Sequence, residues 1–296
     1  MSNKSYLERY NEEHSSVIAS LNVNKRICTR LLGFLISSII YFIIFQISKY
    51  TGLHDIQTQF LNTFVNYIMT VAYIISFFFI VFYVLYISVK SFKESFDKVR
   101  YKLKRMLFII LDWLVILPIC ATVASFCFAF IFTFAQVEGD SMYPNIYNES
   151  TVFVSYLEPV EQFDIVVAYI TPEDNLVSST EYYIKRVIGM PGDTVTWLEG
   201  VLTINGKVVD ETYFDDETKL KFKQDFESRY EFYGLFTYKE SGIKHTTYVI
   251  PDGYYFVMGD NRLNSNDSRH IGLIPACNIE GVVKFEITSS GIERAD

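Results

Sequence analysis

The sequence predicts three transmembrane helices near the N-terminus, followed by a mainly-β extracytoplasmic domain built of antiparallel sheets. Half of the 296 residues are apolar, 17% are aromatic and the mean hydropathy is +0.18, which is too apolar for one soluble domain. From about residue 135 onward, short segments rich in Val, Ile, Tyr, Phe and Thr alternate with turn residues. That alternation is typical of an antiparallel β domain.

Three long apolar runs account for the high hydropathy. Residues 31–47 and 64–89 contain no charged side chain, and residues 106–134 contain only Asp112. Each run reaches the roughly 17–25 residues that a membrane-spanning helix requires, so we predict one transmembrane helix in each. Asp112 lies near the start of the third run, where we expect it to reach the membrane interface or to pair with Lys or Arg.

The charges between the runs predict the orientation. Residues 90–105 carry seven cations and two acids, whereas residues 48–63 carry a single cation, Lys49. By the positive-inside rule, residues 1–30 form a cytoplasmic tail, 90–105 a basic cytoplasmic loop and 48–63 an outer loop. Three crossings then place residues 135–296 outside the cytoplasm, as the catalytic domain of a multi-pass cell-membrane protein. We expect the basic loop to contact anionic lipid, which makes the bilayer a partner.

Charge and cysteine usage argue against several other classes of protein. The net charge of −8 is concentrated in the outer part, so nucleic acid is not expected as a partner. Of the four cysteines only Cys277 lies in that part, which therefore has no intramolecular disulfide to form. It also lacks the usual metal-binding and phosphate-binding motifs, so we expect no metal and no cofactor.

Turn residues divide the β domain into short predicted strands. These strands are residues 151–157, 164–169, 182–188, 194–198, 201–204, 247–249, 254–258 and 282–288. Residues 201–204 and 207–209 flank Asn205-Gly206, a pair that favours the type I′ turn of a β-hairpin. Residues 210–244 are charged and aromatic without clear periodicity, and we interpret them as an insertion of undetermined structure.

Residues 137–144, with the sequence VEGDSMYP, follow the third apolar run. Gly139, Ser141 and Pro144 are typical of a tight turn that presents its side chains to solvent. Such a turn can hold a serine Oγ and a backbone N–H toward the same space, which acyl transfer needs. The alternative is a polar turn that only caps a helix.

The predicted strand 182–188 contains two adjacent cations, Lys185 and Arg186, between apolar neighbours. Successive side chains of a strand point to opposite faces, so at least one of these cations lies against apolar surface. A buried lysine has a lowered pKa, and its neutral amine can accept a proton from a serine hydroxyl, whereas arginine stays charged. Alternatively, Lys185 extends along the strand to water.

Residues 259–269 are dense in side-chain donors and acceptors. They form either a solvated loop or a shell of groups that orients a catalytic site. In this loop, Ser265 or Ser268 can hold an amine in place. A Ser-His-Asp triad with His245 or His270 is a further possibility, although the turn at residue 141 lacks the Gly-x-Ser-x-Gly pattern.

Taken together, these stretches resemble the bacterial type I signal peptidases, the membrane-bound Ser/Lys proteases of peptidase family S26. The matching blocks are VEGDSMYP at 137–144, FDIVV at 163–167, IKRVIGMPGD at 184–193 and MGDNRLNSNDSR at 258–269. The resemblance covers about residues 112–283. It implies the signal peptidase/LexA-like β fold, with Ser141 as nucleophile and Lys185 as general base. We then expect about 2.6–3.2 Å between Ser141 Oγ and Lys185 Nζ.

The resemblance also implies supporting residues. Ser265 matches the hydroxyl that orients the lysine, and Asp267 and Arg269 match a pair that stabilises the site. Gly139 stands where some relatives have a serine that donates to the oxyanion, so the oxyanion hole is expected to use backbone N–H groups, chiefly that of Ser141. Asn145 and Phe163 depart from the usual Thr and Gly, and neither change removes a catalytic group.

The function implied is a serine endopeptidase that removes N-terminal signal peptides from exported pre-proteins by cleaving after small residues. Met142, Tyr183 and Ile184 are expected to line the substrate pockets. Besides the signal peptides, the secretion translocon is a candidate partner. Two alternatives stay open, namely a catalytically idle signal-peptidase-like scaffold and a Ser/Lys protease with one dedicated partner substrate.

Overall fold

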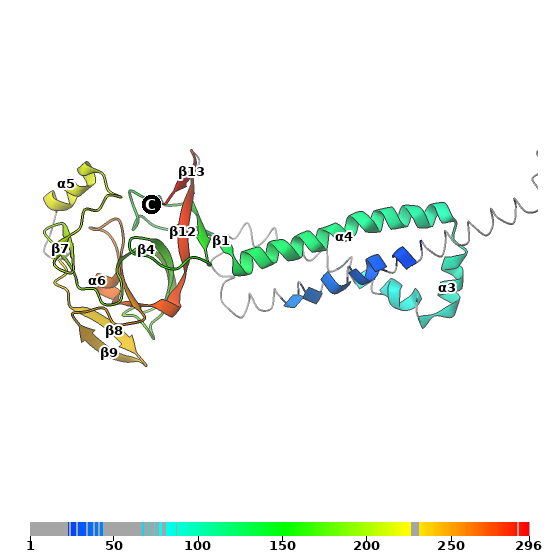
Figure 1. The fold of residues 1–296 in the computed structure, drawn as a ribbon, viewed down its shortest axis with the longest axis horizontal. Coiled ribbons are helices and arrows are strands. Elements are labelled where there is room, and N and C mark those ends of the chain that lie inside the picture. Colours follow the sequence, from blue (N-terminus) through cyan, green and yellow to red (C-terminus); the bar gives the residue numbers. More distant parts are fainter. Residues whose placement is uncertain are drawn as a thin grey trace, which may run out of the picture. The chain divides into compact units, whose positions relative to one another are not determined.

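The computed structural model describes residues 88–225, 231–288 and 290–295, together with scattered positions between 23 and 86. The chain divides into two compact units, of which the second consists mainly of the chain from Phe130 onward. The described part of the first unit is helical, and the second unit is mainly β (Figure 1).

The first unit contains helix α3, Lys90–Asp97, and helix α4, Tyr101–Phe130. A small apolar core consists of Val23, Ile27 and Leu31, packed against Phe82, Tyr83, Phe96, Leu107 and Phe108. Asp112 Oδ1 lies 2.7 Å from Arg30 Nε, which confirms one of the two outcomes expected for this acid.

The prediction of three transmembrane helices is wrong for the part of the chain that the structure describes. No helix formed by the described residues is both long and apolar enough to cross a membrane. The first two predicted spans, 31–47 and 64–89, are described only in part. The third, 106–134, includes residues that belong to strand β1, Phe132–Gln136, rather than to a helix. Hydropathy measures how apolar a run is and does not by itself separate a buried strand or helix from a span.

The second unit is built on one antiparallel sheet in the order β1-β2-β12-β3-β4-β10-β11, with β13 paired to β12. Its remaining strands are β2 Thr151–Ser155, β3 Ile165–Ile170, β4 Glu181–Gly189, β10 Tyr254–Met258, β11 Ile274–Pro275, β12 Ile279–Thr288 and β13 Gly291–Arg294. The antiparallel, mainly-β prediction therefore fits this unit.

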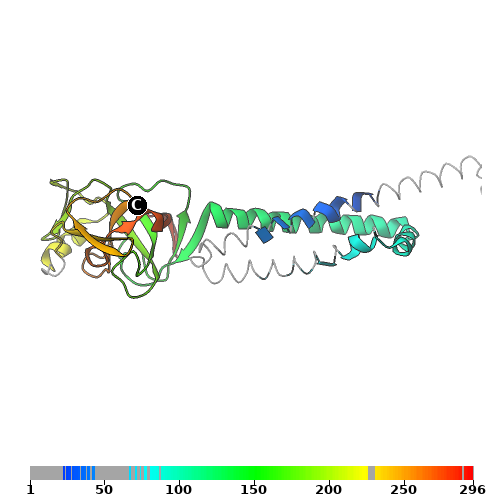
Figure 2. The ribbon, with the colours of Figure 1, turned by 90° about the horizontal axis from the view of Figure 1, so that it is seen from below.

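Among the described residues, two smaller sheets and three short helices complete the unit. They are β5 Val195–Leu198, β6 Val201–Ile204 and β7 Lys207–Val208, the hairpin β8 Phe236–Glu240 and β9 Ile243–Thr247, helices α5 Asp216–Gln224 and α6 Ser268–Ile271, and the 3₁₀ helix η2 Ala276–Asn278. Within the β unit, α5 and the β8–β9 hairpin lie at the end away from β1 (Figures 1 and 2).

Local signals explain where the strand predictions were right and wrong. β6 and β10 have the predicted bounds, and Asn205 and Gly206 both have positive φ, as a type I′ turn requires. The strand predicted at 247–249 is wrong, because the chain is paired in β9 and leaves the hairpin after Thr247. The insertion 210–244 holds α5, which begins where Asp215 accepts a hydrogen bond from the Thr218 N–H.

Candidate active site

The turn that carries Ser141 follows β1. It is held both by packing against the apolar core and by hydrogen bonds to the loop after β10. Met142 is almost completely buried in an apolar cluster with Val152 and Val154 of β2. On the other side, the Asn261 N–H donates to the Ser141 carbonyl oxygen over 3.0 Å. Asn261 Nδ2 donates to the carbonyl oxygen of Asp140, also over 3.0 Å. The turn is therefore held by the loop after β10 and by the core beneath it.

Gly139 has the positive φ of +89° that favours glycine, and its N–H donates to Asn148 Oδ1 over 2.8 Å. That N–H is thus already bonded within the turn. The N–H of Ser141, in contrast, has no hydrogen-bond partner among the residues the structure describes. Of the two donors, the one at Ser141 is available to a ligand.

Lys185 lies on β4, and its side chain is only 4% exposed. Its Nζ is 2.8 Å from Ser141 Oγ and donates to the carbonyl oxygen of Ile184, also over 2.8 Å. The ammonium position is 5.0 Å from the centre of the Tyr183 ring. The separation of Oγ and Nζ falls in the range expected for direct proton transfer, and no described residue other than Lys185 has a side-chain hydrogen bond to Ser141 Oγ.

Burial lowers the pKa of Lys185 from 10.5 to about 8, against the opposing pull of the Asp267 and Asp260 carboxylates. Desolvation penalises the charged amine, and here it outweighs two nearby negative charges. Near neutral pH a usable fraction of the Lys185 side chain is therefore a neutral amine. A neutral amine in contact with a serine hydroxyl can act as a base toward it.

A cavity of about 590 Å³ opens beside these two side chains. It is lined by the end of β1 and the turn, by β4, and by one residue each of β3 and of the loop after β10: Ala135, Gln136, Val137, Glu138, Ser141, Met142, Val167, Glu181, Tyr182, Tyr183, Ile184, Lys185 and Asn266. The three residues predicted to line the substrate pockets, Met142, Tyr183 and Ile184, are all among them.

Two strand edges border this cavity. β1 pairs only with β2 in the described sheet. Residues 181–185 of β4 pair with β3 on one side, whereas β10 reaches β4 only from Arg186 onward. Both edges offer backbone N–H and C=O groups, so an extended peptide can pair with them in the manner of an added strand.

Asp267 and Arg269 form a buried ion pair. Arg269 Nε donates to Asp267 Oδ1 over 2.8 Å, and Arg269 Nη2 to Oδ2 over 2.9 Å. Burial raises the pKa of Asp267, but Arg269 and the N–H of Gly259 outweigh it and hold this pKa below its usual range. Asp267 also caps helix α6. One carboxylate thus fixes both ends of the loop 259–269.

Ser265 lies close to the Ser141 turn, but no hydrogen bond joins it to Lys185. A Cβ added at Gly259 would be 2.3 Å from Ser265 Oγ and 2.4 Å from the Ser141 carbonyl oxygen. Ser265 and the Ser141 turn therefore both lie so close to Gly259 that no side chain fits at this position. The expected role of Ser265 in orienting Lys185 stays a prediction.

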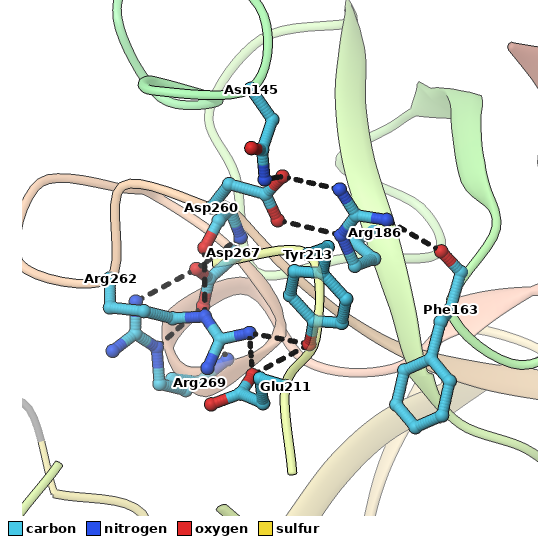
Figure 3. Close-up of polar contacts among 10 residues, drawn as sticks. Asn145, Phe163, Arg186, Glu211, Tyr213, Asp260, Arg262, Asp267 and Arg269 are labelled. Carbon is cyan, nitrogen blue, oxygen red and sulfur yellow. Dashed lines mark hydrogen bonds and ion pairs between the residues drawn. The ribbon is translucent and has the colours of Figure 1, made fainter. Parts of the chain in front are cut away.

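Sequence reasoning missed the ionic contacts behind the site, which Figure 3 shows. Arg186 forms a bidentate pair with Asp260, and Asn145 Nδ2 donates to Asp260 Oδ2 over 2.7 Å. Arg262 pairs with Glu211, which comes from the segment interpreted as an insertion. For Arg186 a signal existed, since a cation on an apolar strand needs a counter-charge. For Glu211 no local pattern pointed to its partner.

Comparison with known proteins supports a family assignment. Residues 110–288 match the model of the family described as signal peptidase, peptidase S26. The chain is similar to signal peptidase I S of Bacillus subtilis (strain 168), with 39% identity over 186 residues, 60% of this chain and 88% of that protein. It is also similar to a signal peptidase I of Streptococcus pneumoniae serotype 4, with 36% identity, 53% of this chain and 83% of that protein.

A solved signal peptidase I from Enterococcus faecalis V583 is 28% identical and matches 42% of this chain and 97% of its own length, with a TM-score of 0.29. The family assignment rests on the sequence matches and not on this structural similarity. The family model covers more than half of the chain, and the Bacillus subtilis relative is matched over most of its length. This chain therefore belongs to the signal peptidase, peptidase S26, family.

Proposed function

We propose that Ser141 and Lys185 form the catalytic pair with which this member of the family removes signal peptides from exported pre-proteins. The observation that carries the proposal is the 2.8 Å separation between Ser141 Oγ and the Nζ of an almost fully buried lysine. A catalytically idle scaffold has no need to keep an amine desolvated against a hydroxyl at the edge of a cavity.

The proposed reaction proceeds in two halves. Neutral Lys185 accepts the proton of Ser141 as Oγ attacks the scissile carbonyl, and the resulting oxyanion accepts a hydrogen bond from the Ser141 N–H. Lys185 then gives its proton to the leaving amine, which departs as the N-terminus of the mature protein. In the second half Lys185 takes a proton from water, whose oxygen attacks the acyl group, and the proton returns to Ser141.

The substrate is proposed to bind as an extended strand between the free edges of β1 and β4. Backbone pairing there brings the scissile carbonyl toward Ser141, and alternate side chains point into the cavity. Met142, Tyr183 and Ile184 are proposed to bound the pockets for these side chains and to favour small, Ala-like ones. The support is that all three line the cavity beside the pair.

The test uses the purified full-length protein and a pre-protein with a known signal peptide, with the product identified by N-terminal sequencing. Lys185→Ala is expected to lower kcat/KM by about 10²–10⁴-fold, the usual contribution of a positioned base, and Ser141→Ala by at least as much. Lys185→Arg keeps a cation but supplies no base, so it is expected to fail as well.

Matched controls are Ser150→Ala and Lys207→Ala. Ser150 is a buried serine near the same turn that donates to the Tyr147 carbonyl oxygen, and Lys207 is an exposed lysine of β7. Both variants are expected to process the pre-protein normally. If Ser141→Ala or Lys185→Ala cleaves as fast as these controls, the proposed pair is wrong. If the wild type cleaves only one of many pre-proteins, the dedicated-partner alternative replaces the general activity.

We also propose that the β unit acts outside the cytoplasm, next to the bilayer and the translocon. In support, the aromatic rings of Phe132, Phe134, Phe153 and Phe285 gather on one side of β1, β2 and β12, with centroids 5.0–6.0 Å apart. Phe285 is 43% exposed, and aromatic rings are enriched at membrane interfaces. Weaker flotation of Phe285→Ser with lipid vesicles would support the bilayer contact, and unchanged flotation would oppose it.

Cys277 provides a test of the location, because it is exposed and is the single cysteine of the β unit. A membrane-impermeant maleimide applied to intact cells is expected to label it, and Cys277→Ser is expected to lose that label. Labelling of Cys277 that appears only after the cells are lysed would contradict the location. Crosslinking from position 277 to translocon subunits tests whether the translocon is a partner. Absence of such crosslinks would contradict this part of the proposal.

A further inference from the structure

The short segment between β7 and α5 lies against the back of the site. Glu211 and Phe214 are buried there, and Tyr213 is half-buried. The Tyr213 hydroxyl donates to Glu211 Oε1 over 2.6 Å. Burial raises the pKa of Tyr213 far above its usual value, so the hydroxyl stays protonated at every working pH. This segment therefore presents a carboxylate and a fixed phenol toward the inside of the unit.

Both groups contact Arg262, which is completely buried. Arg262 Nη2 pairs with Glu211 and lies 3.1 Å from the Tyr213 hydroxyl, and its guanidinium is 5.1 Å from the centre of the Phe214 ring. Arg262 Nε in turn donates to the carbonyl oxygen of Gly259 over 3.2 Å. A buried guanidinium needs a counter-charge to be tolerated, and Glu211 supplies it.

The same tyrosine also touches β4. The Arg186 guanidinium lies 4.0 Å from the centre of the Tyr213 ring, and Arg186 directly follows Lys185 in the strand. Figure 3 shows Tyr213 between Arg186 on one side and Arg262 on the other. One side chain thus joins the strand that carries Lys185 to the loop that holds the Ser141 turn.

We propose that Glu211 and Tyr213 are positioning residues, which hold β4 and the loop 259–269 together so that Lys185 stays desolvated and within reach of Ser141. This inference rests on the proposed catalytic pair. Neither residue touches the cavity or the reacting atoms, so their effect reaches the reaction only through Arg186 and Arg262.

The charges around Lys185 determine what loss of this contact would do. The Asp260 and Asp267 carboxylates face the amine from the loop, each paired with a guanidinium, Arg186 and Arg269 respectively. The Tyr183 ring covers it from its own strand. If the loop moves away from β4, water reaches the amine and the two carboxylates move away together with the loop. Burial affects the pKa of Lys185 more than the two carboxylates do, so the gain in solvation outweighs their loss and this pKa rises.

Tyr213→Phe tests the proposal with the smallest change, since it removes only the hydroxyl. The matched control is Tyr233→Phe, because Tyr233 is exposed and its hydroxyl bonds Glu231 with the same two-residue spacing. The measurement is kcat/KM of the full-length protein on a pre-protein across pH 6–10. The acidic limb of this pH profile is the range in which kcat/KM rises as the base loses its proton. For Tyr213→Phe we expect this limb to move up by about one pH unit, which lowers kcat/KM at pH 7 about tenfold.

Tyr213→Leu, which also removes the ring against Arg186, is expected to move the limb further, and Tyr233→Phe is expected to leave it in place. A purely structural role predicts lower activity by the same factor at every pH, with an unmoved limb, and that result would overturn the proposal. If Ser141→Ala or Lys185→Ala stays active in the same assay, the catalytic pair itself is wrong. If both are inactive and the limb of Tyr213→Phe is unmoved, only the positioning role is wrong.

Discussion

Arg186 and Asp260 form a bidentate ion pair that is sealed from solvent, with side chains 1% and 0% exposed. Arg186 Nε donates to Oδ1 over 2.9 Å and Nη2 to Oδ2 over 2.7 Å. Arg186 follows Lys185 in β4, and Asp260 also accepts from Asn145 near the Ser141 turn. A single carboxylate therefore joins the two segments that carry the proposed catalytic pair.

Loss of that carboxylate is expected to be costly. Asp260→Asn leaves the Arg186 guanidinium buried without a counter-charge, and breaking a buried pair in this way costs about 3–5 kcal/mol of folding free energy. Asp210→Asn is the control, because it breaks the more exposed pair with Lys219, whose loss is expected to cost much less stability because solvent screens the two charges. Denaturant unfolding measures both, and equal losses for the two variants would contradict the importance of the Arg186–Asp260 pair.

Gly259→Ala is expected to disrupt the site directly. The new methyl group would lie 2.4 Å from the Ser141 carbonyl oxygen and 2.3 Å from Ser265 Oγ, so the turn and the loop have to separate. We expect kcat/KM to fall at least about tenfold, because small displacements of reacting groups cost about that much or more.

The control for this change is Gly242→Ala in the β8–β9 turn, where a methyl group meets open space and only the positive φ is strained. That strain costs about 1–2 kcal/mol and leaves the site untouched. Normal cleavage by Gly259→Ala, in the assay that compares the two variants, would show that the turn and loop do not need their observed contact.

Lys185→Met is expected to stabilise the protein while it abolishes cleavage. The folded-state pKa of about 8 lies below the ordinary 10.5, so between these values the folded chain binds fewer protons than the unfolded chain and stability rises with pH. Below about pH 8 the buried amine is charged, and its desolvation lowers the free energy of unfolding by about 3 kcal/mol. The thermal midpoint of Lys185→Met should exceed that of the wild type at pH 7, and the gap should narrow by pH 10.

A wild type that is more stable than Lys185→Met at pH 7, with no change in the difference at higher pH, would mean that burial does not penalise the lysine. Lys207→Met provides the comparison for an exposed lysine, and its midpoint should follow the wild type at both pH values.

Ile184→Ala is expected to widen the range of cleavage sites. Ile184 lines the cavity beside Ser141, and its truncation makes room for a larger side chain before the scissile bond. A few methylene groups in such a pocket change discrimination about 10–200-fold. The measurement is the ratio of kcat/KM for pre-proteins with Ala and with Val at that position. An unchanged ratio would exclude Ile184 from this pocket.

The sequence predicted those parts of the site that have a local signal. Small and turn-forming residues predicted the turn at Ser141, and the place of Lys185 on an apolar strand made a buried amine one of two interpretations. The resemblance to the signal peptidases then singled out both residues. The hairpin after β6 followed from Asn205-Gly206. Partners remote in the sequence had no such signal: Arg186 and Asp260 are 74 positions apart, and Arg262 and Glu211 are 51 apart. Such pairs are created by the packing of the strands and not by local preference.

Composition was a poorer guide than pattern near the boundary of the two units. Residues 132–136, with the sequence FTFAQ, follow a long apolar run, so hydropathy assigned part of them to a span. Their alternating burial, with Thr133 and Ala135 buried and Gln136 exposed, is that of a strand paired with β2. Strand periodicity over so few residues is easily hidden within a continuous apolar run.

The pH dependence of kcat/KM for the wild-type protein tests the role of Lys185 most directly. The acidic limb of this profile reports the pKa of the essential base in the free enzyme. If Lys185 is that base, kcat/KM on a pre-protein falls about tenfold for each pH unit below about 8 and levels off above it. A profile that is flat from pH 6 to 10, or a limb near the ordinary histidine value of about 6.5, would contradict it.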